Sequence, residues 1–157
     1  MLARRALSVA EITERLELRA FPASSVRDEV RRLGRAGLLD DLSVARSVCQ
    51  AQVRAGRGRR AMVAALRRRK LGRDTAAEAI EEVLEGDESA ALAASFARAT
   101  AKHRFWRRLP EERRKVLRYL LARGFGLDDV RRAMRENGRE EPHGSETDDA
   151  GDPSGVS

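Results

Sequence analysis

A short phrase occurs three times in this chain, and it constrains the fold more than any other feature. The phrase is Leu-x-x-Arg-x-Φ-[Ser/Gly]-x-x-x-Φ-x-x-x-Φ, where Φ is an apolar residue. Its copies begin at Leu2, Leu66 and Leu120, so they start 64 and then 54 residues apart. A fixed local pattern at variable spacing predicts tandem copies of one supersecondary unit, each too small to bury its apolar face alone. We therefore expect function to lie along a surface and not in a single pocket.

Local signals predict helices joined by short turns. No long stretch alternates with period two, so strands are not expected. Two segments, Ser8–Glu11 and Thr75–Glu78, have the pattern of a capping box at a helix start. Pro110 suits the first position of a helix, Gly37 is placed to end a helix in the left-handed conformation, and Gly56 ends another apolar stripe.

These signals divide the chain into modules. We expect an all-α fold of three tandem three-helix modules that form an elongated, curved chain. The first module, which is short, covers residues 1–39; a basic second module covers 40–86; the third covers 87–138. Residues 139–157 contain Gly, Ser, Asp, Glu and Pro with almost no apolar residue, so they predict a disordered acidic tail.

The net charge of +7 is unevenly distributed. Residues 139–157 carry one arginine against six acidic residues, a net of −5, which leaves +12 on the preceding 138 residues. A strongly basic body favours a polyanionic partner, above all nucleic acid. Coding bias explains why 29 of the 32 basic residues are arginine, but it does not explain why acidic residues vanish from particular segments.

Two segments lack acidic residues altogether: one lies between Asp41 and Asp74, the other between Ser89 and Pro110. On a helical wheel, Met62 and Leu66 lie on one side of the helix. The opposite side, which should face solvent, carries Arg60, Arg67 and Arg68. An anionic partner accounts for such runs, and a merely solvated basic face is the alternative. The candidate contacts to a partner or to nucleic acid are Arg57, Arg59, Arg60, Arg67, Arg68, Lys70, Arg104, Arg107 and Arg108.

Two further features have both a functional and a structural interpretation. Phe105 and Trp106, among basic residues, could stack on bases, but in a chain with few aromatics we expect them in the core. Arg5, Arg69 and Arg123 recur at one position of the phrase, at the end of a helix. We expect them to interact with a helix C-terminus or to reach across a module junction, in preference to contacting a ligand.

Nothing in the sequence indicates catalysis. His103 and His143 are the two histidines, and no Cys/His cluster has metal-ligand spacing. Phosphate loops and nucleophile elbows are lacking, so we expect no enzyme activity, metal or cofactor. The single cysteine, Cys49, cannot form an internal disulfide, which suits a reducing cytoplasm, and no run reaches membrane-span length. We expect a cytoplasmic monomer.

The chain resembles the RecX family over about residues 1–138. The resemblance is carried in order by Gly37–Asp41 leading into Ala45-Arg46, then Gly58–Arg60, Leu66–Gly72 and Leu120–Phe125. It implies a cytoplasmic regulator, built of tandem three-helix modules, that binds RecA and lies along the groove of the RecA–single-stranded DNA filament. It further implies restraint of the ATPase, strand-exchange and co-protease activities of RecA. The short first module and the acidic tail depart from the family pattern.

Two other classes of function stay open. The chain could be a basic helical DNA-binding protein that acts without RecA. It could also be a helical adaptor whose basic face meets an acidic protein.

Overall fold

The computed structural model describes residues 6–85 and 88–139, and this part of the chain is entirely helical. Its helices are α1 (Val9–Glu17), α2 (Ala23–Arg35), α3 (Asp41–Arg54), α4 (Arg59–Arg68), α5 (Arg73–Leu84), α6 (Glu88–Lys102), α7 (Pro110–Ala122) and α8 (Leu127–Arg139). The predicted all-α fold is confirmed. Leu2 and Arg5 of the first phrase, and the predicted acidic tail beyond Arg139, lie outside the described residues.

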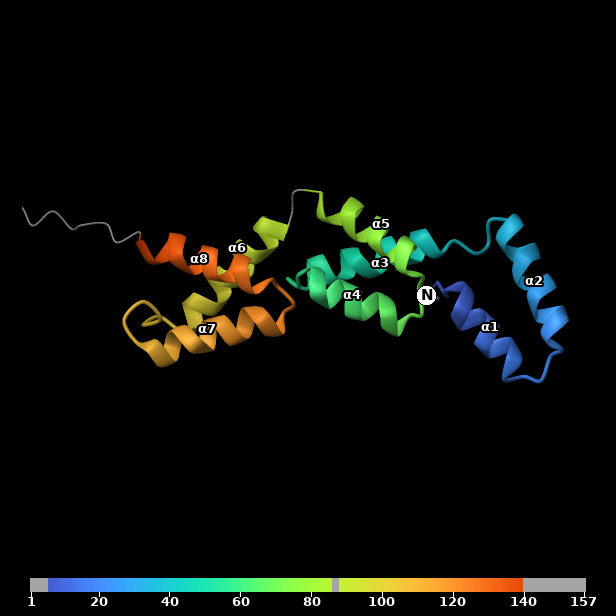
Figure 1. Cartoon of the computed structure of the whole chain (residues 1–157), viewed down its shortest axis with the longest axis horizontal. Helices are drawn as coiled ribbons and strands as arrows, with labels where there is room; N and C mark the ends of the chain where they lie inside the picture. Colours follow the sequence, from blue (N-terminus) through green and yellow to red (C-terminus); the bar gives the residue numbers. More distant parts are fainter. Residues whose placement is uncertain (1–5, 86–87, 140–157) are drawn as a thin grey trace, which may run out of the picture.

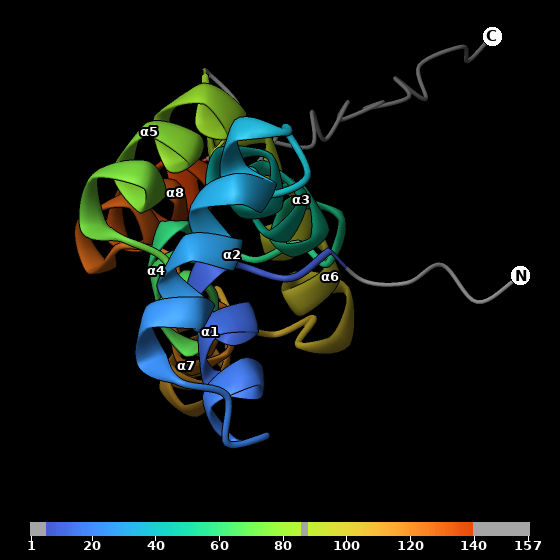
Figure 2. The same ribbon diagram turned by 90° about the vertical axis from the view of Figure 1, so that its right-hand side faces the viewer.

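The helices follow one another in three groups along an elongated molecule (Figure 1). Helices α1 and α2 form one end, α3–α5 the middle and α6–α8 the other end. Viewed from the α1–α2 end, the groups lie one behind another (Figure 2). Residues 6–39 contain two helices. The module boundaries after residues 39, 86 and 138 stay predictions.

The middle group has its own hydrophobic core. Helices α3 and α5 pack directly against each other, because Ala45 and Ala79 are small enough for a close approach and are fully buried. Met62 and Leu66, also fully buried, attach α4 to this pair. Each such large apolar side chain contributes about 1.5–3 kcal/mol by leaving water.

The α6–α8 group has a second, separate core. Trp106, 4% exposed, packs edge-on against Phe96 with ring centroids 5.2 Å apart, and Val116 of α7 is fully buried nearby. The core position predicted for Trp106 is therefore confirmed. The same prediction for Phe105 is wrong, since its side chain is 61% exposed. Helix α6 ends at Lys102, and in the turn that follows the two adjacent rings point to different sides.

The α1–α2 group has the thinnest core. Helix α1 has no buried residue, and α2 buries Val26 alone among the described residues of that helix. The polar Ser8, by contrast, is fully buried. This group must therefore depend on its contacts with the middle group.

Several helix ends follow their local sequence. The capping box of Ser8 is present, and Pro110 begins α7. Gly37 adopts a φ angle of +71°, which confirms its predicted left-handed conformation, and Gly56, after α3, adopts +65°.

The end of α4 and the start of α5 differ from expectation. After α4, Lys70 adopts the left-handed conformation with a φ angle of +55°. The chain turns there, and the next side chain, that of Leu71, is buried in the core. Gly72 then precedes α5, which begins at Arg73 without a side-chain cap. The capping box predicted at Thr75 is therefore wrong, because Thr75 already lies in the first turn of the helix.

Candidate functional site

The first junction, between α1 and the end of α4, is ionic. The guanidinium of Arg69 donates from Nε and Nη2 to the carboxylate of Glu11, at 2.7 and 2.8 Å, and from Nη2 to the carbonyl of Ala6 at 2.6 Å. Ser8 Oγ donates to the Arg69 carbonyl at 2.9 Å. The Arg69 and Glu11 side chains are only 12% and 17% exposed, which strengthens a bidentate pair. Beside them, Lys70 pairs with Glu14 at the surface.

The second junction, between α4 and the end of α7, is built mainly from backbone. The amides of Gly58 and Arg60 donate to the carbonyls of Arg123 and Gly124, at 2.9 and 3.0 Å. A Cβ on Gly124 would lie 2.5 Å from the amide nitrogen of Ala61, and the φ angle of Gly124 is +87°. A glycine is therefore required at this close approach.

Side chains add to the second junction. Arg123 Nη1 donates to the carbonyl of Ala55 at 2.6 Å, and the fully buried Ser95 donates from Oγ to the carbonyl of Gly56 at 3.0 Å. Both carbonyls belong to the C-terminal end of α3. The interpretation of Arg69 and Arg123 as junction residues is thus confirmed, while Arg5 lies outside the described residues.

The two junctions share a plan that the repeated phrase does not reveal. At each, the N-cap of one helix meets the carbonyl of the recurring arginine in the next group: Ser8 of α1 meets Arg69, and Gly58 of α4 meets Arg123. In the structure, Ser8 therefore occupies the same place at its junction as Gly58 does at the other. In the repeated phrase, by contrast, Ser8 has the same position as Gly72. The first copy of the phrase marks a different helix junction from the second copy.

The segment between Asp41 and Asp74 contains no acidic residue, but some of its arginines pair with acidic side chains from later in the chain. Arg46 pairs with Glu82 of α5, and Arg59 pairs with Glu81 at 2.7 Å and with Glu88 at 3.8 Å. The hydrogen bonds from Arg46 and Arg59 lower the pKa of Glu82 and of Glu81, respectively, below the ordinary carboxyl value. These cations are therefore partly neutralised within the fold.

Other arginines of the segment keep their full charge at the surface. Arg60, Arg67 and Arg68 on α4 are exposed and make no side-chain hydrogen bond or ion pair with another described residue. Arg57, just before α4, is exposed and has a weak contact to Gln52 at 3.4 Å. Helix α4 thus presents a cluster of available guanidinium groups.

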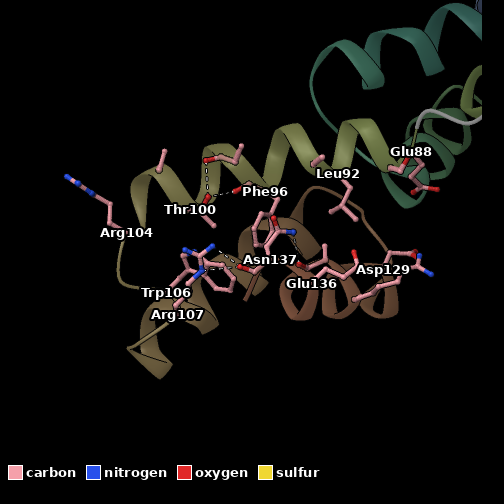
Figure 3. Close-up of a pocket in the computed structure, with 16 residues that line it drawn as sticks. Glu88, Leu92, Phe96, Thr100, Arg104, Trp106, Arg107, Asp129, Glu136 and Asn137 are labelled. Carbon is pink, nitrogen blue, oxygen red and sulfur yellow. Dashed lines mark hydrogen bonds and ion pairs between the residues drawn. The ribbon is translucent and has the colours of Figure 1, made fainter. Parts of the chain in front are cut away.

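The remaining candidates lie apart from α4, around the turn between α6 and α7. Arg104 is exposed at the end of a cavity of about 1000 Å³ between α6 and α8 (Figure 3). Arg107 donates from Nη2 to the carbonyl of Asn137 at 2.7 Å and covers the Trp106 ring, with 5.4 Å from the guanidinium carbon to the ring centroid. Arg108 is exposed.

One basic cluster was missed by sequence reasoning. Four arginines line a groove between α7 and α8, namely Arg113, Arg114, Arg131 and Arg135. In the sequence they stand close to Glu111, Glu112, Asp128 and Asp129, so no acid-free window marks them. The groove lining itself contains no acidic residue, and Glu112 and Asp129 are paired with other side chains, which the sequence does not show.

The described residues offer little else of a chemical kind. They contain no group of three or more His, Cys, Asp or Glu side chains that could hold a metal ion. No helix among them is long and apolar enough to cross a membrane. Cys49 is fully buried, and desolvation raises the pKa of its thiol to about 11, so it is uncharged at neutral pH.

Together these features define a class: a helical protein of tandem modules with exposed basic surfaces. The family model described as RecX, third three-helix domain, matches residues 97–134. A Regulatory protein RecX from Halorhodospira halophila is 35% identical over 136 residues, which cover 85% of this chain and 81% of that protein. Another from Mycobacteroides abscessus is 34% identical over 84 residues, 53% of this chain and 41% of that protein. The chain belongs to the RecX family of regulatory proteins.

Proposed function

We propose that this protein binds RecA and the RecA–single-stranded DNA filament and restrains the ATPase, strand-exchange and co-protease activities of RecA. The observation that carries the proposal is the cluster of unpaired arginines on α4, Arg60, Arg67 and Arg68, at the centre of an elongated molecule. Guanidinium groups bind phosphates and carboxylates in a bidentate way, so such a cluster suits a nucleoprotein surface. Membership of the RecX family supports the same partner.

The nine candidate residues differ in how directly they would act. Arg57, Arg104 and Arg108 join the α4 cluster as exposed cations that need no rearrangement. Arg59, Lys70 and Arg107 already hold intramolecular partners, so a partner must either share them or displace those contacts. We assign the larger share of binding to the first set.

The modular shape supports a partner that repeats along its length. Each group of helices can meet a different part of the filament, and the groups are linked by short junctions. Once one group is bound, the others act at high effective concentration, so individually modest contacts combine. Removing a module should therefore reduce binding more than the loss of one contact would.

The test replaces Arg60, Arg67 and Arg68 together with alanine. Binding to single-stranded DNA and to the RecA filament should weaken, and the slope of log K against log salt should fall by about 0.7 per lost contact. The fold should survive, because the three side chains are exposed. The control replaces Arg19, Arg27 and Arg35, which are exposed near α1 and on α2 and carry the same total charge. A folded α4 variant that keeps the original slope would show that the wrong face had been chosen.

The same unpaired arginines also favour a second candidate, a DNA-binding protein that acts without RecA. Tight binding to DNA combined with unchanged RecA activity would select it.

A further inference from the structure

The groove between α7 and α8 is strongly basic. It has a volume of about 430 Å³ and is lined by Pro110, Arg113, Arg114, Leu117, Arg131, Met134 and Arg135. Four of these seven residues are arginines with exposed side chains, and none is acidic. Leu117, which is partly buried, supplies apolar surface between the charges, and Met134, 3% exposed, lies in the core beneath.

Two of the acidic residues close to these arginines in sequence are paired with other side chains. Glu112 accepts hydrogen bonds from Lys115 and contacts His103, each at 2.6 Å, and Asp129 accepts from Arg132. The four groove arginines make no side-chain hydrogen bond or ion pair with another described residue. Guanidinium groups that line one groove with no acidic residue in its lining repel one another, and a bound polyanion would relieve that repulsion.

One arginine of the groove lies on α7 at the position that corresponds to an arginine of the α4 cluster. Corresponding residues of α4 and α7 are 54 positions apart, as in the pairs Arg69 and Arg123, Leu66 and Leu120, and Met62 and Val116. The same offset places Arg114 at the position of Arg60. Figure 1 shows α4 and α7 along the same edge of the molecule. Two successive groups therefore present a cation at an equivalent position, as a ligand with a repeating charge requires.

We propose that the α7–α8 groove is a second nucleic-acid site, which binds backbone phosphates of a single strand already held by the arginines of α4. The inference rests on the proposed function in so far as that strand belongs to a RecA filament. The planar guanidinium groups fit phosphate oxygens in a bidentate way, while the partly exposed side of Leu117 can pack against sugar or base.

The test replaces Arg131 and Arg135 with glutamine in the full chain and measures binding to oligo(dT) across a salt series. Loss of two phosphate contacts should lower the salt slope by about 1.4. If both proteins bind equally at 1 M salt, the Kd should rise roughly 60-fold at about 50 mM and roughly 14-fold at about 150 mM. The control replaces Arg27 and Arg35 of α2 with glutamine, which changes net charge equally. Equal slopes for the two variants would overturn the proposal.

A second arm tests whether the acidic segment after α8 is the occupant instead. Its six acidic residues, Glu140, Glu141, Glu146, Asp148, Asp149 and Asp152, are all changed to the corresponding amides. If nucleic acid is the ligand of the groove, this change should tighten oligo(dT) binding by a similar factor in two proteins: the one with the native groove and the one with glutamine at positions 131 and 135. Tightening confined to the native groove would assign the groove to the acidic segment and refute the proposal.

The inference and the proposed function can fail separately. A lower salt slope on naked oligo(dT), with no effect of the protein on RecA, would retain the groove and reject RecA regulation. Inhibition of RecA that is insensitive to the groove variant, with an unchanged slope, would do the reverse.

Discussion

The ionic junction between Arg69 and Glu11 should hold the first two helices in place. Replacing Arg69 with methionine keeps much of the apolar stem but removes two hydrogen bonds to Glu11 and one to the carbonyl of Ala6. Helix α1 has no buried residue, and the contacts with the middle group that remain in this variant are polar: Ser8 Oγ donates to the carbonyl of residue 69, the Val9 amide donates to Asp41 at 2.8 Å, and Glu14 pairs with Lys70. We expect α1 and α2 to open locally while the cores of the other two groups persist.

The size of the effect follows from burial. Hydrogen bonds to charged groups contribute about 1.5–3 kcal/mol each, and removing one partner of a buried pair costs about 3–5 kcal/mol. The Arg69 and Glu11 side chains are 12% and 17% exposed, so they are close to buried but still reached by water. We therefore expect about 2–3 kcal/mol for the junction, which corresponds to opening roughly 30- to 150-fold more often.

Native-state hydrogen exchange measures this opening directly. Amides of α1 should exchange roughly 30- to 150-fold faster in the R69M variant, while amides of α7 stay protected. The control is K70M, which removes the neighbouring pair with Glu14, where both side chains are about half exposed, and should cost at most about 1 kcal/mol. If R69M accelerates exchange in α1 no more than K70M does, the junction does not depend on this ion pair.

Three further predictions concern stability and reactivity. Gly124→Ala should destabilise the protein by more than about 2 kcal/mol in urea unfolding, because its Cβ would collide with the α4 backbone, whereas Gly34→Ala in the open face of α2 should stabilise it by up to about 1 kcal/mol; equal effects would contradict the close approach. The Cys49 thiol should react with a thiol reagent far more slowly in the native than in the urea-unfolded protein at about pH 8, since burial raises its pKa; equal rates would mean that it is accessible. Because the pKa of Glu82 is lowered by Arg46, its stabilisation is present above about pH 4.5 and is lost as the pH falls through the folded-state pKa; Arg46→Gln should make acid unfolding less steep in that range, and an unchanged profile would contradict the pair.

Features encoded by a few neighbouring residues could be predicted from the sequence. The capping box at Ser8, the helix start at Pro110 and the left-handed Gly37 each follow from local backbone chemistry. The junction role of Arg69 was also accessible, because a cation inside an apolar arc must find a polar partner. Its partner Glu11 was not, since it lies 58 residues away.

The basic face could be predicted only in part. Counting charges along the sequence found Arg60 and its neighbours, which the structure leaves exposed and without a described partner. It overstated Arg59, whose counter-ion Glu81 lies 22 residues further on and is brought back by the α4–α5 turn. It missed Arg131 and Arg135, because acidic residues stand near them in the sequence, although Asp129 pairs with Arg132 and no acidic residue lines the groove.

The central claim is that this protein regulates RecA without itself performing catalysis. The most direct measurement adds the purified full chain, at substoichiometric amounts, to the cognate RecA on single-stranded DNA and follows ATP hydrolysis together with co-sedimentation. We expect hydrolysis to fall as the chain is added and the chain to sediment with the filament, with both effects weakened by the triple alanine variant of Arg60, Arg67 and Arg68. Hydrolysis at the control rate over a wide range of concentrations, with the chain left in the supernatant, would contradict the account.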